Sequence, residues 1–193
     1  MNSFFDYTAI FSKRGMFLAL MNLLFFGGVF AVVIVSEWLF PPSLDLNVRS
    51  PFLEAFFNGD FYVSAFAIFI FNLAWSVFVL ILIPSFFFFP LSIASLFFRA
   101  FIWGSLLYSQ PTWVFLVAIP TVILEGEGCV LAAFAGTLAG ASWVKPGWVY
   151  REENLGRREA FGRSLSECSA VYALVIVLIL AGAVVETATL MVI

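Results

Sequence analysis

Long apolar runs, separated by short segments rich in proline, glycine or charge, dominate the chain. Runs of about 18 or more apolar residues are typical of transmembrane helices. Five runs are long enough: Met16–Trp38, Phe61–Ile83, Phe86–Tyr108, Thr112–Val144 and Ser169–Ile193. The pattern therefore predicts an all-α, polytopic membrane helix bundle with about five crossings.

The fourth run, Thr112–Val144, is too long for one untilted crossing and carries two acids, Glu125 and Glu127. An ionised carboxylate at the centre of a bilayer costs roughly 2.5 kcal/mol or more. Pro120 lies upstream, and a glycine follows each acid, which lowers the helix propensity of this stretch. The sequence predicts a helix broken near 120–130, with at least one carboxylate in a polar cavity.

Charge is concentrated at two places, Lys13-Arg14 and the stretch Lys145–Arg163. Residues 1–15 read as an amphipathic interfacial segment, with a frayed terminus as the alternative, and 16–193 as one transmembrane domain. Basic residues favour the cytoplasmic side of a membrane. The sequence therefore predicts a multi-pass cell-membrane protein with a cytoplasmic N-terminus, a cytoplasmic 145–166 loop and an outside C-terminus.

Composition narrows the function classes. The chain is 63% hydrophobic and 11% charged, with a net charge of −3 and no histidine. Histidine-dependent catalysis and histidine metal centres are excluded, and the scattered basic residues argue against nucleic-acid binding. The Glu-Glu-x-x-x-Arg pattern at 152–157 resembles that of intramembrane proteases, but those enzymes need histidines. We expect no enzyme, no cofactor and no disulfide between Cys129 and Cys168.

Four polar residues fall near mid-membrane in this topology: Asn72, Arg99, Glu125 and Glu127. If Arg99 pairs with one carboxylate, the other acid needs a proton, water or a cation. The four residues are therefore a predicted ion- or proton-binding site, with Glu186 nearer the outside as an entrance residue. A structural polar clamp that fixes helix register is the alternative, and the sequence leaves both open.

Small residues recur every fourth position after the acids, at Gly128, Ala132, Gly136 and Gly140. Such stripes let helix backbones approach closely in membranes. We expect this stripe to face another helix, either within the fold or in a second copy of the chain.

The segment Pro120–Glu125, followed by the small-residue helix Ala132–Gly140, resembles the stage II sporulation protein M family. That family carries a late membrane segment of the form Pro-His-Gly-x-x-Glu before an Ala/Gly-rich helix. Asn72, the corner Pro84–Pro90 and the stretch Arg99–Gly104 are similar in order and spacing to earlier family features.

The chain departs from the family pattern at three positions. Thr121 stands in place of the histidine, Val122 in place of the glycine, and Glu127 is an additional acid. The sporulation member of the family resembles a scaffold in a cell-wall-remodelling complex, whereas many relatives have no assigned activity, so the resemblance implies little about function.

Two functional hypotheses follow from these residues. The first is a small channel or carrier for a proton or for a monovalent or divalent cation. The second is a non-catalytic scaffold that recruits protein partners through Lys145–Arg163. The lipid bilayer is an expected partner in both, and both leave a homo-oligomer open.

Overall fold

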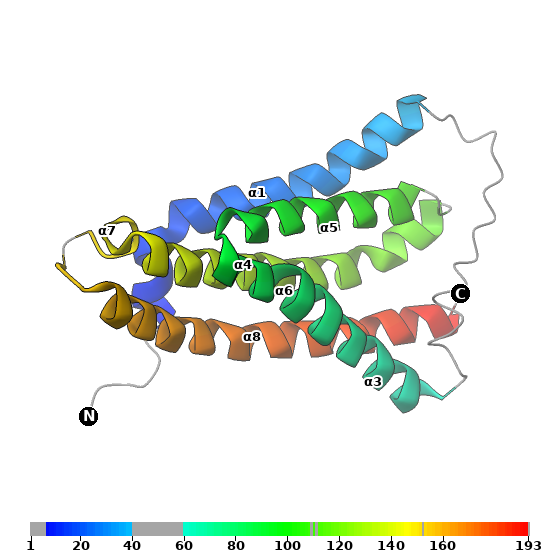
Figure 1. The fold of residues 1–193 in the computed structure, drawn as a ribbon. Helices are drawn as coiled ribbons and strands as arrows, with labels where there is room; N and C mark the ends of the chain where they lie inside the picture. The colour runs from blue at the N-terminus through cyan, green and yellow to red at the C-terminus, as the bar shows by residue number, and fades with distance from the viewer. Residues whose placement is uncertain (1–6, 40–59, 109, 111, 152, 193) are drawn as a thin grey trace.

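The apolar runs form long helices that lie lengthwise beside one another (Figure 1). A computed structural model describes residues 7–39, 60–108, 110, 112–151 and 153–192. Within these residues every regular element is a helix, and five stretches are long and apolar enough to cross a membrane. The elements are α1 (Tyr7–Leu39), α3 (Phe61–Phe71), η1 (Asn72–Leu82), α4 (Ile83–Phe87), α5 (Pro90–Tyr108), α6 (Thr112–Val144), α7 (Pro146–Val149) and α8 (Arg157–Val192). The predicted all-α bundle with five membrane-length helices is confirmed.

Helix α1 changes direction at Arg14, where the backbone leaves helical geometry (φ −130°, ψ 18°). Gly15 follows directly, and its low helix propensity favours a kink at this position. Phe11 and Phe17, on either side of the kink, both pack on the Phe134 ring of α6, at centroid distances of 6.0 and 5.8 Å. The kink thus lies at the predicted end of the interfacial segment, of which residues 1–6 lie outside the described part.

The second span continues through Pro84, which the sequence led us to expect as its end. Helix α3 passes into the π-helical segment η1 at Asn72, and η1 passes into α4, which ends at Phe87. Pro84 lies in the first turn of α4. Proline has no N–H to donate to the preceding turn, and here it lies at the junction of η1 and α4 without ending the helical stretch. The third span accordingly begins at Pro90, not at Phe86.

Helix α6 runs without interruption from Thr112 to Val144, with Pro120 inside it. The predicted break near 120–130 is therefore wrong. The glycines beside the acids serve packing instead of breaking the helix. A Cβ at Gly126 would come within 2.5 Å of the Phe25 ring on α1, and one at Gly128 within 2.7 Å of Ile179 on α8.

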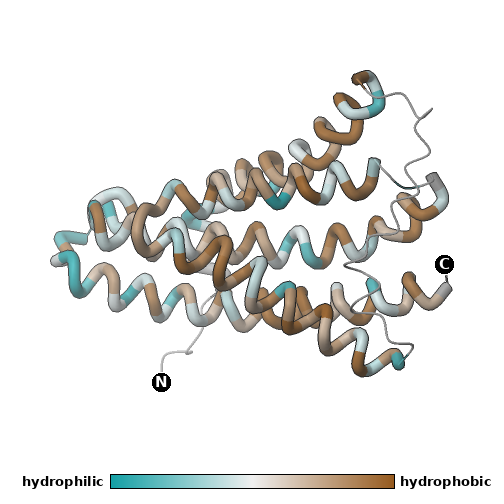
Figure 2. The backbone as a smooth tube through the Cα atoms, turned by 45° about the vertical axis from the view of Figure 1, so that its right-hand side comes forward, coloured by the Kyte–Doolittle hydropathy of each residue, from teal (hydrophilic) through white to brown (hydrophobic). Residues whose placement is uncertain are grey.

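The last span is longer than its apolar run. Helix α8 begins at Arg157, twelve residues before the predicted start at Ser169, and takes in much of the charge-dense stretch. Its first turns leave the apolar part of the bundle together with α7, at the left end of Figure 1. Figure 2 shows hydrophilic residues gathered at this end, while the middle of the bundle is mostly apolar.

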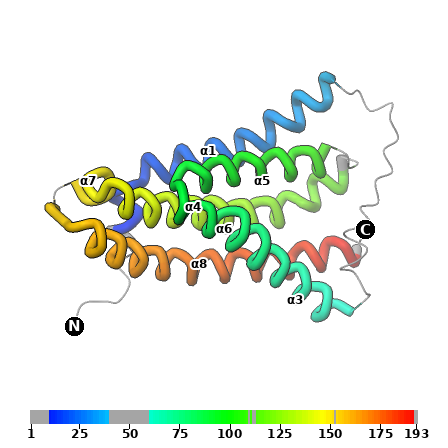
Figure 3. The backbone as a smooth tube through the Cα atoms, viewed as in Figure 1, coloured from blue at the N-terminus to red at the C-terminus, as the bar shows by residue number. Residues whose placement is uncertain are grey.

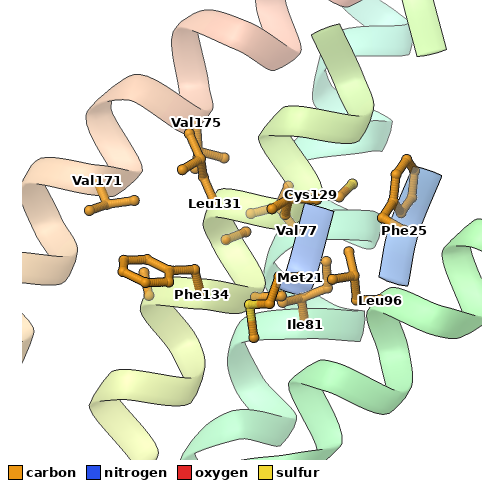
Figure 4. Packing of buried hydrophobic residues seen from close by; sticks show 14 of the residues in the cluster. Met21, Phe25, Val77, Ile81, Leu96, Cys129, Leu131, Phe134, Val171 and Val175 are labelled. Atoms are coloured by element: carbon orange, nitrogen blue, oxygen red, sulfur yellow. The ribbon is translucent and has the colours of Figure 1, made fainter. Parts of the chain in front are cut away.

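Helix α6 is the central element and packs along α8 for most of its length, as the tube in Figure 3 shows. From Gly128 to Ser142 every residue of α6 is buried. Around it, buried apolar side chains from α1, η1, α5 and α8 interlock (Figure 4). The labelled members are Met21, Phe25, Val77, Ile81, Leu96, Cys129, Leu131, Phe134, Val171 and Val175.

The first and last spans place the two chain termini at opposite ends of the bundle. Arg14 of α1 bonds Glu167 of α8, so the start of the first span and the start of the last lie at one end. The C-terminus of α8 lies at the opposite end in Figure 1. Five crossings require this arrangement, because an odd number places the two chain termini at opposite faces.

Candidate functional site

A carboxylate buried in the middle of the bundle is the centre of the site. Glu125 of α6 is 1% exposed. Its Oε1 accepts a hydrogen bond from Nδ2 of Asn72 over 2.7 Å. Asn72 is the first residue of η1, and its own Oδ1 accepts a longer bond of 3.5 Å from Ser76, one turn further on. Two of the four predicted midplane residues are thus in direct contact.

Room for the Glu125 side chain is made by a glycine on α8. A Cβ at Gly182 would lie 2.5 Å from Cγ of Glu125 and 3.4 Å from its Oε1. The first distance is much shorter than ordinary van der Waals contact, and the second is at its lower limit. The Glu125 side chain therefore occupies the space that a side chain at position 182 would take. The position of Gly182 therefore decides whether α6 and α8 can close over the acid.

Glu186 lies one helical turn beyond Gly182 and within electrostatic range of Glu125. The antiparallel register of α6 and α8 explains this. Gly128 meets Ile179 and Glu125 meets Gly182, so the next turn brings Glu186 level with Thr121. Glu186 is partly exposed, whereas Thr121 is 2% exposed. Glu186 is thus a neighbour of the central carboxylate, nearer the end of α8.

Arg99 of α5 supplies the positive charge of the site. It is 8% exposed and lies within electrostatic range of both Glu125 and Glu186. Across the described part of the chain, the ion pairs closer than 4.0 Å do not include Arg99. The predicted pairing of Arg99 with a carboxylate is therefore an interaction at longer range, and its Nε has no hydrogen-bond partner among the described residues.

Glu127 does not join this cluster. In an uninterrupted helix its side chain points about 200° away from that of Glu125. It is half-buried against α1, where its partner is the Asn22 amide. The two acids were expected to converge through a broken helix. They separate because α6 is intact, and each finds an asparagine on a different neighbouring helix.

The small-residue stripe lies between helices along the inner half of α6. A Cβ at Gly136 would lie 2.8 Å from the Ser85 hydroxyl of α4, and one at Gly140 would collide with the Ser85 carbonyl. The Ala132 carbonyl accepts a hydrogen bond of 3.3 Å from the Tyr172 hydroxyl of α8. All four stripe residues are buried within the chain itself.

Sequence reasoning missed Gly182, Thr121 and Asn22 as neighbours of the acids. Gly182 and Glu186 form a Gly-x-x-x-Glu pair on one face of α8, the same spacing at which Thr121 precedes Glu125 on α6. That repeated interval of four was the signal available in the sequence. It shows which side of α8 is small and acidic, but not which helix faces it.

A second polar cluster lies at the opposite end of the bundle from the C-terminus. Arg14 donates to Glu167 over 2.8 Å, and Arg163 pairs with both Glu153 and Glu167. The two guanidinium groups lie 5.6 and 5.0 Å from the centre of the Tyr150 ring. Burial, with a smaller contribution from Glu167, raises the pKa of Tyr150 to about 12. The cluster joins α1 to α8 and is structural in character.

A groove of about 480 Å³ lies on the outer face of α3 and η1. Its lining, between Phe66 and Val79, is apolar. An apolar, open groove on a membrane-length helix suits lipid chains, and its lining includes no charged side chain with which to bind a polar solute.

The chemistry of the central site follows from its members. Two carboxyl groups, one guanidinium and one amide lie in an apolar surrounding. Among the described residues, clusters of three or more histidine, cysteine, aspartate or glutamate side chains are absent, so the acids do not form a ready metal site. Comparison of the chain with protein-family models, with curated proteins and with solved structures finds no match.

Proposed function

We propose that the chain is a small integral membrane carrier or channel for protons, in which Glu125 and Glu186 share one transferable proton. The observation that carries this proposal is the surrounding of Glu125: a 1% exposed carboxylate with a second carboxyl and one guanidinium in electrostatic range. The five membrane-length helices supply the framework that such a site needs.

Charge balance supports a proton-binding role. With all three groups ionised, the site would carry one uncompensated negative charge inside an apolar bundle, which is costly. One proton or one monovalent cation restores neutrality. Two carboxyl groups close together titrate as a coupled pair, so the pair can hold one proton over a range of pH. This is the property that proton-coupled transport requires.

Ligand number favours a proton over a divalent cation. Calcium takes about six to eight oxygen ligands and structural zinc takes about four protein ligands. Glu125, Glu186 and the amide of Asn72 offer fewer, and the Asn72 amide turns its nitrogen, not its oxygen, toward Glu125. A divalent cation at this site would have to take most of its ligands from water.

Proton flux into proteoliposomes tests the proposal. The protein is reconstituted with a pH-sensitive dye inside the vesicles, and a pH gradient is imposed. We expect wild-type protein to dissipate the gradient and Glu125→Gln to lose that activity, because the amide cannot take up a proton. Glu127→Gln is the matched control, since Glu127 faces α1, and it should keep wild-type flux.

A structural clamp within a membrane scaffold is the second candidate, and two observations favour it. Helix α6 is unbroken, and the Asn72–Glu125 bond joins two helices directly. Exposed Arg157 and Arg158 at the start of α8 would then be available to a protein partner. Equal proton flux in empty vesicles and in vesicles with wild-type protein, together with a loss of thermal stability in Glu125→Gln, would establish the clamp.

The sidedness and the family relation are part of the same proposal. Basic residues at the Arg14 end support a cytoplasmic location for that end, with the C-terminus outside. The Pro120–Glu125 spacing and the small-residue helix support a relation to the stage II sporulation protein M family. Cysteine labelling at the two ends in sealed vesicles, with Gly162→Cys for one end and Gln110→Cys for the other, tests the sidedness.

A further inference from the structure

Buried polar atoms without a hydrogen-bond partner gather around Glu125. Four such atoms in the described chain lie on α5 and α6. They are Oγ1 of Thr121, Oε2 of Glu125, Nε of Arg99 and Nε1 of Trp103. Buried polar atoms in proteins are nearly always bonded, either to protein or to an ordered water molecule.

These four atoms belong to two helices and are spaced by one turn on each. Arg99 and Trp103 are four residues apart on α5, and Thr121 and Glu125 are four residues apart on α6. Residues at this spacing share a helix face. Three of the atoms are hydrogen-bond donors and Glu125 offers an acceptor, which is the mixture of partners that water molecules accept.

On the other side of Glu125, the polar side chains within Gly128–Ser142 of α6 are bonded, and the unpartnered hydroxyls of Tyr150 and Ser164 lie beyond that segment, at the Arg14 end. Every residue of α6 from Gly128 to Ser142 is buried, and most of them are apolar. Thr137 bonds the Ala133 carbonyl and the Ser92 hydroxyl, each over 2.7 Å, and Ser142 bonds the Ala139 carbonyl. Fifteen buried residues at the helical rise of 1.5 Å make a plug of about 20 Å.

The distance to the other end is shorter and the residues on it are more open. Glu186 is partly exposed and lies six residues before the end of α8, which corresponds to about 9 Å of helix. Thr121 faces it from α6 at the same level. The first turn between the central carboxylate and that end of α8 therefore carries two polar side chains, Thr121 and Glu186.

We propose that water reaches the Glu125–Glu186 pair from the end of the bundle at which α8 terminates, past Thr121, and that Gly128–Ser142 of α6 closes the opposite side. In this state, closed on the opposite side, the proton that leaves a carboxyl group passes to this water as hydronium, and the carboxylate is reprotonated from the same water. The inference rests on the proposed function in taking the carboxyl pair as the proton-binding group. The hydrated route itself stands on the polar atoms and the packing.

Cysteine accessibility tests the route without relying on transport. In a background with Cys129→Ala and Cys168→Ala, Thr121→Cys is exposed to a membrane-impermeant cationic thiosulfonate in sealed proteoliposomes. We expect the reagent to label Thr121→Cys in the same fraction of protein molecules as it labels Gln110→Cys. Gln110 marks the end of the bundle where α5 joins α6. Ala118→Cys, one turn nearer that end, carries the same test if Thr121→Cys does not fold.

Two matched positions serve as controls. Ile123→Cys lies at nearly the same depth as Thr121 but on the exposed apolar surface of α6, and lipid should protect it completely. Ala135→Cys lies in the closed half and should also stay unlabelled. The inference would be overturned if Ala135→Cys were labelled. It would also be overturned if the labelled fraction of Thr121→Cys matched that of Gly162→Cys, which marks the other end.

The two proposals fail separately. Proton flux by wild-type protein with an unreactive Thr121→Cys would remove the hydrated route and keep the proposed function. Full labelling of Thr121→Cys with no proton flux would keep the route and remove the transport function.

Discussion

Asn72 of η1 donates a 2.7 Å hydrogen bond to Glu125 of α6, and this contact joins two spans that are far apart in the chain. It forms although α6 never departs from helical geometry. The bond lies at the first residue of η1, where the backbone hydrogen bonding changes from α-helical to π-helical. The start of η1 thus coincides with the contact to the acid.

The Asn72–Glu125 contact should appear as an energetic coupling. In a double-mutant cycle of Asn72→Ala and Glu125→Gln, we expect a coupling energy of about 0.6 kcal/mol or more, since interhelical bonds in membranes average near this value. Thermal or denaturant unfolding in detergent gives the four stabilities. The pair Asn72→Ala and Glu127→Gln is the control, and its effects should add within about 0.3–0.5 kcal/mol because Glu127 faces α1.

Gly182 should tolerate no side chain. In Gly182→Ala the new methyl group meets Cγ of Glu125 at 2.5 Å, so we expect a loss of about 1–3 kcal/mol of stability from overpacking. The melting temperature in detergent measures it. Gly27→Ala is the control, because its nearest neighbour would be an ordinary 3.6 Å away, and alanine there should be neutral or stabilising by up to about 1 kcal/mol. Equal melting temperatures for the two variants would contradict the close approach at Gly182.

The Arg14–Glu167 pair should contribute more to stability than a typical surface pair does. The side chains are 14% and 20% exposed, and the Arg14 guanidinium also lies over the Tyr150 ring. Arg14→Gln should therefore cost about 1 kcal/mol, at the upper end of the range for ion pairs at surfaces. Lys13→Gln, at the exposed neighbouring position, should leave the melting temperature unchanged. A similar loss in both variants would show that net charge, not the contact, is responsible.

Tyr150 should make stability fall at high pH. Burial raises its pKa to about 12 in the folded protein, whereas an exposed tyrosine titrates near about 10. Between these values the folded state holds one more proton than the unfolded state, so the free energy of unfolding decreases as pH rises through the window of about 10 to 12. Below about pH 10 the contribution is fully present. Unfolding measured across this window should show the slope in wild-type protein, and Tyr150→Phe should abolish that component.

Hydropathy sufficed to find the five spans, and even the bounds of α6, Thr112 and Val144, follow from its flanking residues. The sequence also pointed to Asn72 and Glu125 as midplane residues, and the structure brings them into contact. The spans and the two midplane residues were both predicted from the position of each residue along a membrane-crossing helix. Depth depends only on distance along a helix, so a single chain reveals it.

The direction in which each side chain points is not encoded in the same way. Gly126 and Gly128 lie next to two acids, and their low helix propensity, considered without tertiary neighbours, predicts a break in the helix. Their actual role depends on Phe25 and Ile179, which come from other helices and occupy the space that the glycines leave. The same dependence hid Gly182. A glycine marks a close approach or a weak point according to its neighbour, and the neighbour is a property of the tertiary fold.

The contact between Glu125 and Gly182 also has a consequence for recognising homologous chains. The two positions form one steric unit divided between α6 and α8, so substitutions at them cannot be accepted independently. A chain with a larger residue at 182 would need a shorter side chain at 125, such as aspartate, to keep an acid between the helices. A joint pattern that pairs Thr-x-x-x-Glu on one helix with Gly-x-x-x-Glu on another should therefore discriminate relatives better than either helix searched alone.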